Sequence, residues 1–243
     1  MAESGDAKPF AGQLALVTGA SKGIGAATAQ ALAAAGAHVV LTARDAKALE
    51  AVEEAIFEAG GSATIAPVDL AEPEGVARLV AALAQRWDAL DILVLAAAYF
   101  PQLTPVTQLD SRDFNKTLTL NLMAQQALLA HADRMLKASK DARVIALTSS
   151  VGAEPRAYWG AYGASKAALD TLLAAYAEEV RAISAIRVAI VDPGATRTQM
   201  RARAYPGEDP ASVKPPETVA ARLVALAGEP FVTGHRERIN HAV

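Results

Sequence analysis

The sequence predicts a protein of the α/β class, in which helices cover both faces of a doubly wound parallel sheet of about seven strands. Short apolar runs alternate with longer segments of helical periodicity along almost the whole chain. The apolar runs are nearly continuous, which is typical of strands that are buried on both faces. No stretch rich in Gly, Pro or Ser divides the 243 residues, so we expect a single domain over residues 1–243.

The first half of the chain predicts four strands that alternate with three helices. Four short runs rich in Val, Leu, Ile, Ala and Thr predict the strands Leu14–Thr18, His38–Thr42, Ala63–Pro67 and Asp91–Leu95. Alanine-rich or amphipathic stretches between them predict helices at about Gly23–Ala35, Lys47–Glu58 and Glu72–Arg86.

The second half of the chain continues the alternation with longer helices. Extended helical periodicity predicts helices over Ser111–Ala138 and Tyr162–Ile183, and apolar runs predict strands at Arg143–Thr148 and Arg187–Val191. Five prolines and glycines in Arg201–Pro216 predict an irregular loop, followed by a last helix near Glu217–Ala227.

Composition excludes several classes of function. The net charge of −3 gives no reason to expect binding to nucleic acid or to an anionic membrane. The chain has no cysteine, and its four histidines lack the spacing of metal ligands; a solvated tail is the expected place of His235 and His241. Met1–Phe10 lacks the apolar core of a signal peptide, and no window reaches the roughly 20 apolar residues of a membrane span. We therefore expect a cytoplasmic protein without a metal site.

A glycine-rich loop follows the first expected strand directly. The segment 18–25 reads Thr-Gly-Ala-Ser-Lys-Gly-Ile-Gly and leads into a helix. Glycines permit a tight turn that lets the backbone approach a pyrophosphate, and the N-terminus of the helix favours negative charge. This order predicts a dinucleotide-binding Rossmann fold, against the alternative of a glycine-rich turn without a ligand.

The end of the second strand favours NADP(H) over NAD(H). NAD sites commonly place an acid there for the ribose 2′-hydroxyl, whereas this chain has Ala43 followed by Arg44. Arg44 and Lys22, in the glycine loop, suit a 2′-phosphate. The alternative is that Arg44 merely pairs with Asp45 or with solvent. Asp69, after the third strand, is expected to bind the adenine amine or else to cap the helix near Glu72.

Tyr162 and Lys166 form the expected catalytic pair. Residues four apart on a helix share a face, and a neighbouring ammonium favours a phenolate. We therefore expect the lysine to lower the pKa of the tyrosine, so that Tyr162 acts as a general acid or base.

These motifs together resemble the short-chain dehydrogenase/reductase family from Gly12 to about Met200. The resemblance rests on the glycine loop, Asp69, the LDILV segment at 90–94, the YGASK segment at 162–166 and the PGATRT segment at 193–198. It implies hydride transfer between a nicotinamide and a carbonyl or alcohol of a small molecule. The catalytic group that it implies consists of Asn121, Ser149, Tyr162 and Lys166.

The family spacing selects the serine among three consecutive hydroxyl residues. The family serine stands three residues before a glycine and thirteen before the tyrosine, which implies Ser149, with Ser150 as the alternative. Asn121 would hold a water for proton relay, or it is a buried amide bonded to backbone. The implied cofactor contacts are Gly19, Ser21, Lys22, Gly23, Ile24, Gly25, Arg44, Asp69, Leu70, Ala97, Tyr162, Lys166, Pro193, Gly194, Thr196 and Thr198. Capping of a turn is the alternative role for Thr196.

Two segments depart from the family pattern. Leu95-Ala96-Ala97-Ala98 replaces the usual Asn-Asn-Ala-Gly, which predicts altered packing without loss of nucleotide binding. Thr233-Gly234 resembles the start of the last strand, but the usual Asp-Gly-Gly ending is absent, which puts the family tetramer contact in doubt.

The substrate and the assembly are less constrained. An apolar pocket with a lid over about residues 196–216 is expected from Tyr99, Phe100, Pro155, Tyr158, Trp159 and Met200. The alternative is that these residues only pack within the fold. The arginines Arg156, Arg201 and Arg203 either receive an anionic group or are solvated. The two long helices suit a homodimer or homotetramer. Alternative functions are a 3-oxoacyl-carrier-protein reductase, a non-catalytic NADP(H) sensor and an oligomerisation partner of an active relative.

Overall fold

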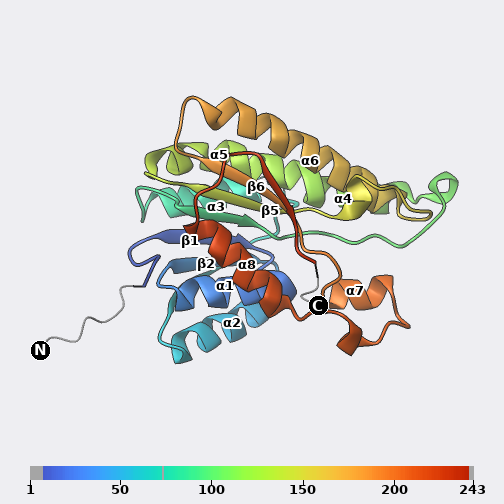
Figure 1. Ribbon diagram of the computed structural model, residues 1–243, viewed down its shortest axis with the longest axis horizontal. Helices are drawn as coiled ribbons and strands as arrows, with labels where there is room; N and C mark the ends of the chain where they lie inside the picture. The colour runs from blue at the N-terminus through green and yellow to red at the C-terminus, as the bar shows by residue number, and fades with distance from the viewer. Residues whose placement is uncertain (1–7, 73, 241–243) are drawn as a thin grey trace, which may run out of the picture.

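The computed structural model describes residues 8–72 and 74–240, and all structural statements below concern these residues (Figure 1). Seven strands form one parallel sheet in the order β3-β2-β1-β4-β5-β6-β7. They are β1 (Leu14–Thr18), β2 (His38–Ala43), β3 (Ser62–Pro67), β4 (Ile92–Leu95), β5 (Arg143–Leu147), β6 (Arg187–Asp192) and β7 (His235–Arg238). The strand order reverses between β1 and β4, which is where open parallel sheets bind ligands beyond the carboxyl ends of their strands.

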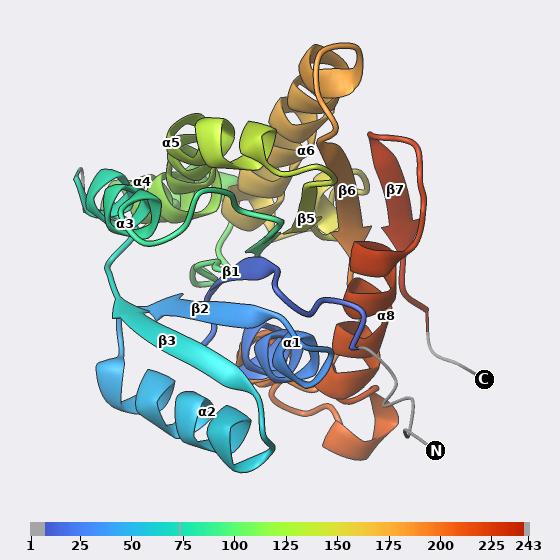
Figure 2. The same cartoon turned by 90° about the vertical axis from the view of Figure 1, so that its left-hand side faces the viewer.

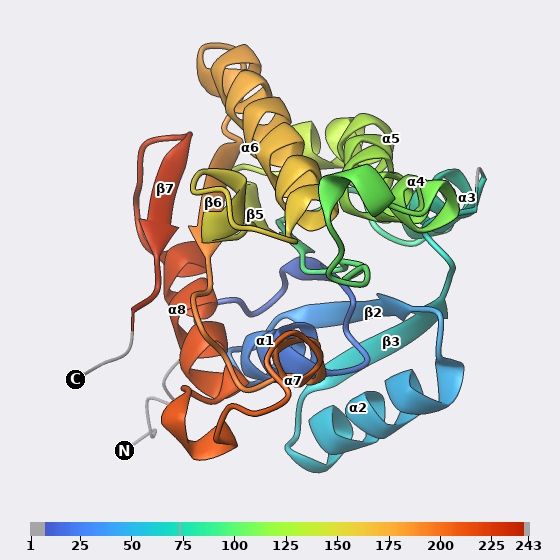
Figure 3. The ribbon, with the colours of Figure 1, turned by 90° about the vertical axis from the view of Figure 1, so that its right-hand side faces the viewer.

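Helices cover both faces of the sheet, as Figures 2 and 3 show from opposite sides. One face carries α1 (Gly23–Ala34), α2 (Ala46–Glu58) and α8 (Pro216–Gly228). The other face carries α3 (Gly75–Ala84), α5 (Ala124–Ala138) and α6 (Gly160–Arg181), with α4 (Ser111–Leu118) leading into α5. The short helix α7 (Gln199–Ala204) lies at the end of the molecule that faces the viewer in Figure 3.

The strands divide their side chains between two separate hydrophobic cores. In β1, Leu14 and Leu16 pack under α3, α5 and α6, whereas Ala15 and Val17 pack under α1, α2 and α8. This alternation follows from the two-residue period of a strand, and burial of both sets explains why the strands read as continuous apolar runs. The predicted fold class is thereby confirmed.

Several predicted boundaries differ from the structure. The helix expected from Glu72 begins only at Gly75, because the carbonyls of Asp69 and Glu72 first close two turns with the N–H groups of Glu72 and Gly75. The expected continuous helix Ser111–Ala138 is interrupted by a π-helical segment, Thr119–Met123. The expected irregular loop before the last helix contains two short helical segments. They are α7 and a 3₁₀-helix, Pro210–Ser212.

The expectations for the chain ends meet the structure only in part. His235 lies in β7, where its ring contacts Glu237 at 3.1 Å, so its assignment to a solvated tail was wrong. Residues 1–7 and His241 lie outside the described residues. Over the described ranges, none of the helices combines the length and apolar character that a bilayer crossing requires.

Candidate active site

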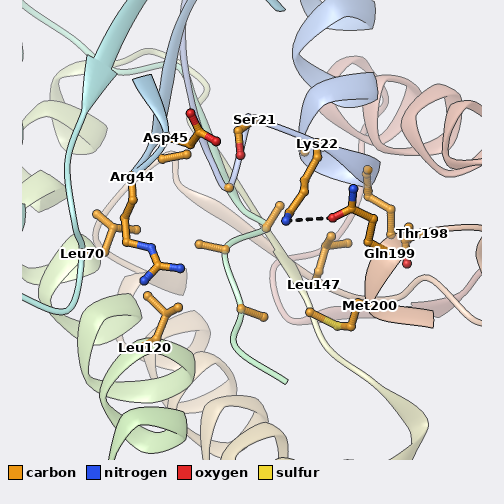
Figure 4. A pocket seen from close by; sticks show the side chains of 18 of the residues that line it. Ser21, Lys22, Arg44, Asp45, Leu70, Leu120, Leu147, Thr198, Gln199 and Met200 are labelled. Carbon is orange, nitrogen blue, oxygen red and sulfur yellow. Dashed lines mark hydrogen bonds between the residues drawn. The ribbon is translucent and has the colours of Figure 1, made fainter. Parts of the chain in front are cut away.

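A cavity of about 590 Å³ opens at the carboxyl ends of the strands (Figure 4). Its volume lies within the usual range of ligand sites. Its walls come from the loops after β1 to β6 and from α6. Most of the sequence-predicted cofactor residues line it: Gly19, Ser21, Lys22, Gly23, Ile24, Gly25, Arg44, Asp69, Leu70, Ala97, Tyr162, Lys166, Pro193 and Thr198.

The glycine loop is folded so tightly that side chains are excluded at two positions. A Cβ atom on Gly25 would lie 2.3 Å from the carbonyl oxygen of Gly19, and one on Gly19 would lie 2.9 Å from the Cα of Ala97. Gly19 and Gly23 also have positive φ angles of 67° and 57°. Among the described residues, no side chain caps the N-terminus of α1. The free N–H groups of its first turn are therefore available to bind an anion in the cavity.

Arg44 does not pair with Asp45, contrary to that alternative from the sequence. The carboxylate of Asp45 accepts a hydrogen bond from the N–H of Ala48 and caps α2. The Arg44 side chain is 60% exposed and lies 3.9 Å from the carboxylate of Asp69. Figure 4 shows its guanidinium directed into the cavity. A flexible cation is therefore available where the second strand ends.

Asp69 and Lys22 make contacts that the sequence did not predict. Asp69 accepts a hydrogen bond from the N–H of Ala71 within a turn, so the interpretation of Asp69 as a cap of a helix at Glu72 was wrong. Lys22 donates from Nζ to Oε1 of Gln199 at 3.0 Å, which links the glycine loop to the start of α7. Lys22 and Arg44 therefore lie on different sides of the cavity (Figure 4).

Tyr162 and Lys166 lie side by side on α6 at the inner end of the cavity, and both are buried. The Nζ of Lys166 lies 5.8 Å from the centre of the Tyr162 ring and donates to the carbonyl of Leu147 at 2.8 Å. Burial lowers the pKa of Lys166 to about 8, because the ammonium is desolvated, although Asp170 opposes this shift.

The expected fall in the pKa of Tyr162 was wrong for this structure. Burial raises the pKa of Tyr162 above its ordinary value, and the charge of Asp192 adds to the rise. Desolvation disfavours the charged phenolate, and the buried lysine does not offset this effect. The phenol is therefore protonated at neutral pH and can donate its proton. Its hydroxyl points to the sulfur of Met200 at 3.9 Å.

The three consecutive hydroxyl residues after β5 have different partners. Thr148 donates to the carboxylate of Asp170, and Ser150 accepts a weak hydrogen bond of 3.4 Å from Arg156. Over residues 8–72 and 74–240, the hydroxyl of Ser149 makes no side-chain hydrogen bond within the protein. Its extended backbone, with φ −161° and ψ 144°, precedes a 3₁₀ turn. Of the three, Ser149 alone has no side-chain partner among the described residues, although it is not part of the cavity lining.

Asn121 lies in the π-helical segment and is fully buried. Its Oδ1 accepts from the N–H of Tyr99 at 2.6 Å, and its Nδ2 donates to the carbonyl of Tyr99 and to Oγ of Ser165. Both amide hydrogens are therefore used. A relay water could bind this side chain only through the remaining acceptor capacity of Oδ1. π-Helical turns of this kind occur frequently at functional sites.

The turn after β6 is held by its own threonine and by a buried lysine. Thr196 donates to the carbonyls of Pro193 and Gly194, in agreement with the turn-capping alternative. Lys214 donates to the carbonyl of Ala195 at 2.9 Å and, through its backbone, pairs with Thr196. The two ends of the segment between Thr196 and Lys214 therefore lie side by side, so that the segment forms a closed loop. Thr198 caps α7 by accepting from the N–H of Arg201.

The unusual segment Leu95–Ala98 is tethered by side chains from elsewhere. The hydroxyl of Thr18 donates to the carbonyl of Val94 and accepts from the N–H groups of Ala96 and Ala97. Gln125 donates to the carbonyl of Ala97 at 3.2 Å. The backbone after β4 is thus fixed without an asparagine in the segment itself.

An apolar cluster packs around Tyr162. Phe100, Val151 and Tyr162 are its buried members, and Trp159 and Met200 pack against it. The rings of Phe100 and Tyr162 meet edge to face at 5.3 Å between centres. Two other expected pocket residues, Pro155 and Tyr158, are exposed at the rim.

The structure separates some predicted residues from the cavity and adds others. Asn121, Ser149, Gly194 and Thr196 are absent from its lining. The cavity is also lined by residues that were not predicted from the sequence, among them Val68, Leu120, Leu147 and Gln199. Leu120 could have been found as the neighbour of Asn121, and Leu147 as the end of an apolar run. Gln199 carries no sequence signal, because its place depends on α7. Within the described residues, no group of three or more His, Asp or Glu side chains is arranged to hold a metal ion.

Comparisons with known proteins agree with these features. The family model for short chain dehydrogenase matches residues 13–209. The uncharacterized oxidoreductase YciK of Escherichia coli is 31% identical over 89% of this chain and 86% of its own length. The cis-4-hydroxycyclohexanecarboxylate dehydrogenase of Sinomonas cyclohexanicum is 32% identical over 93% and 94% of the two chains. A metagenomic short-chain oxidoreductase solved in complex with NADP is 32% identical, with a TM-score of 0.83 over 96% and 99% of the chains.

Proposed function

Because this chain belongs to the short-chain dehydrogenase family of oxidoreductases, we propose that it transfers a hydride between NADP(H) and a carbonyl or secondary alcohol group of a small molecule. The observation that carries the proposal is the buried pair of Tyr162 and Lys166 at the inner end of a dinucleotide-sized cavity. A sensor without chemistry would have no need to bury both an acid and a cation against this cavity.

The residues of the cavity fit a dinucleotide. The glycine loop excludes side chains where a pyrophosphate would approach, and the uncapped N-terminus of α1 favours its charge. Bound in the cavity, the cofactor would supply the hydride chemistry at its nicotinamide. The protein has to supply position and protons.

Arg44 supports NADP(H) over NAD(H). The acid expected of an NAD site is replaced by Ala43, and the neighbouring Asp45 is used to cap α2. The planar fork of Arg44 suits a 2′-phosphate, and its single, long contact with Asp69 leaves donors available. The NADP complex of the metagenomic relative agrees with this assignment.

In the proposed reduction, Tyr162 donates its phenolic proton to the carbonyl oxygen of the substrate. Its raised pKa keeps the proton in place at neutral pH until charge develops on that oxygen. Ser149, whose hydroxyl has no protein side-chain partner among the described residues, binds the same oxygen. Lys166 uses one N–H on Leu147 and has two left for the cofactor ribose and the developing phenolate.

The remaining residues position this group. Asn121 fixes the backbone of Tyr99 and bonds Ser165 on α6, one residue before Lys166. The turn at Pro193 and Gly194 would hold the nicotinamide end of the cofactor, and the loop over residues 196–216 is the lid over the substrate. We also propose a homodimer or homotetramer that uses the outer surfaces of α4, α5 and α6, where Met123 is exposed. A monomeric mass in gel filtration would contradict this assembly.

The test is NADPH oxidation by the purified protein against ketones, aldehydes, diketones and 3-oxoacyl thioesters, with NADH in parallel. The panel should include 4-oxocyclohexanecarboxylate, because the Sinomonas relative acts on the corresponding alcohol. Tyr162→Phe should keep NADPH binding and lose about 10²–10⁴-fold in kcat. Tyr176→Phe is the matched control on α6, because Tyr176 bonds Asp133 away from the cavity. Unchanged turnover in Tyr162→Phe would sink the proposed mechanism.

A further inference from the structure

Two arginines without an acidic partner lie at the rim of the substrate side. The aromatic cluster beside the proposed reacting group consists of Phe100, Trp159, Tyr162 and Tyr205. Arg156 lies at one side of it, where it donates to the hydroxyl of Tyr205 at 3.3 Å and to Ser150 at 3.4 Å. Arg203 on α7 lies at another side and donates to the carbonyl of Phe100 at 3.3 Å.

All three of these hydrogen bonds are long and go to neutral acceptors. Hydrogen bonds of arginine to an anion are shorter and stronger, and the guanidinium has five donors in a fixed fork. Across the described part of the chain, no carboxylate lies within 4.0 Å of Arg156 or of Arg203. Most of the binding capacity of both guanidinium groups is therefore unused by the protein.

Arg201 shows the contrast within the same helix. Its Nε and Nη2 both donate to the carboxylate of Glu208, and its guanidinium stacks on the ring of Tyr205 at 3.7 Å. Arg201 is thus neutralised within the protein and stabilises the lid. The sequence treated the three arginines alike, whereas the structure assigns Arg201 a structural role and leaves the other two available.

The segment that carries Arg156 is also held in a strained conformation. Tyr158 has a φ angle of 72°, the sole positive value of a residue other than glycine within residues 8–72 and 74–240, and it is 58% exposed. Its carbonyl accepts from the N–H of Thr104 at 3.2 Å. Such strain costs of order 1–3 kcal/mol and is found preferentially at ligand clamps. The segment thereby holds Arg156 beside the aromatic cluster and leaves the ring of Tyr158 exposed.

We propose that the substrate has an apolar, ring-bearing body and a carboxylate. The aromatic cluster contacts the body, and the reacting carbonyl or alcohol lies at Tyr162 and Ser149. The guanidinium groups of Arg156 and Arg203 at the edge of the cluster supply the positive charge that attracts and binds the carboxylate. The planar fork of each arginine matches a carboxylate in shape and charge. The position of the reacting group in this inference rests on the proposed function. The carboxylate of the substrate is inferred from Arg156 and Arg203 alone.

The test is calorimetric binding of two ketones to the protein saturated with NADP⁺, which has no hydride to give. The probes are 4-acetylbenzoate and its neutral methyl ester. We expect the acid to bind at least about tenfold more tightly than the ester, and the preference to fall at high salt. Arg156→Gln and Arg203→Gln should each weaken binding of the acid by about tenfold, whereas Arg156→Lys should keep part of it.

Arg78→Gln is the matched control, because Arg78 lies on α3 and its guanidinium makes only surface ion pairs with Glu72 and Glu74. It should bind both probes as the unaltered protein does. Equal affinity for acid and ester, absence of binding by the acid, or unaltered binding in both glutamine variants would each overturn the proposal. A circular dichroism melt separates loss of binding from loss of the fold.

Turnover distinguishes this inference from the proposed function. Selective binding of the acid without NADPH-dependent reduction would support the anion site and contradict the oxidoreductase proposal for such substrates. Equal kcat/KM for both ketones would support the oxidoreductase and overturn the anion site.

Discussion

The side chain of Asn121 clamps the backbone of Tyr99 through both of its polar groups. The N–H of Tyr99 donates to Oδ1 at 2.6 Å, and Nδ2 donates to the carbonyl of Tyr99 at 2.9 Å. The second amide hydrogen goes to Ser165, which directly precedes Lys166. One buried amide thus joins the segment after β4 to α6, the helix that carries Tyr162 and Lys166.

Replacement of Asn121 should therefore destabilise the fold as well as the site. Asn121→Leu removes the partner of the part-buried N–H and carbonyl of Tyr99, and a buried group left unsatisfied costs about 1–3 kcal/mol. We expect the free energy of unfolding in urea to fall by about 2–4 kcal/mol. Asn115→Leu, on the exposed surface of α4, is the control and should change it by less than about 0.5 kcal/mol. Similar losses in both variants would contradict the clamp.

Gly25 should not tolerate even a methyl group. In Gly25→Ala the new Cβ would lie 2.3 Å from the carbonyl oxygen of Gly19, so the glycine loop has to move. We expect a loss of about 1–3 kcal/mol in stability and a marked loss of NADPH binding. Gly207→Ala is the matched control in the lid, where no atom lies within 4 Å of the new Cβ. NADPH titration of both variants checks this, and tight binding by Gly25→Ala would refute the role of the loop.

Arg44 should set the preference between the two nicotinamide cofactors. Arg44→Gln removes the charge but keeps a hydrogen-bonding side chain, so affinity for NADPH should fall by about 10–100-fold and affinity for NADH should change little. Fluorescence titration with each cofactor measures both. Arg78→Gln, which disrupts only surface ion pairs with Glu72 and Glu74, is the control. A parallel fall for NADH and NADPH would point to a general loss of the site.

Lys166 should make stability rise with pH above neutrality. Its pKa is lowered to about 8 in the folded chain and is near 10.4 when unfolded, so the unfolded chain binds more protons between these values. Unfolding therefore becomes less favourable as pH increases through this window. Between pH 7.5 and 9.5 the folded protein should gain about 1–2 kcal/mol relative to Lys166→Met.

The measurement is urea unfolding of both proteins at the two pH values. The comparison cancels the contribution of other groups that titrate alike in the two proteins. The raised pKa of Tyr162 acts with the opposite sign only above about pH 10, where its unfolded form loses the proton first. A stability difference that does not change with pH would show that Lys166 titrates normally.

The sequence predicted the layers of this protein because they depend on local patterns. Continuous apolar runs such as Leu14–Thr18 indicate strands covered on both faces, and the structure buries every residue of that strand. The glycine loop, Tyr162 and Lys166 were also predictable, because each depends on spacing along a single loop or helix.

Features that depend on contacts between distant segments were missed. The π-helical segment at Asn121 is stabilised by Tyr99 and Ser165, which lie on other elements, so helical periodicity alone predicted a continuous helix. The pKa of Tyr162 was predicted in the wrong direction, because spacing shows the neighbouring lysine but does not show the depth of burial. The link from Lys22 to Gln199 spans most of the chain and leaves no mark in either local sequence.

The pairing of Thr196 with Lys214 has a consequence for how this protein can change over evolution. The lid departs and returns at one fixed point, where Lys214 also holds the turn beside the cavity through Ala195. A closed surface loop can be lengthened, shortened or reshaped at small cost, because loop-closure entropy grows slowly with length. New substrates can therefore be accommodated by altering residues between these two anchors, while Tyr162 and the glycine loop remain as they are.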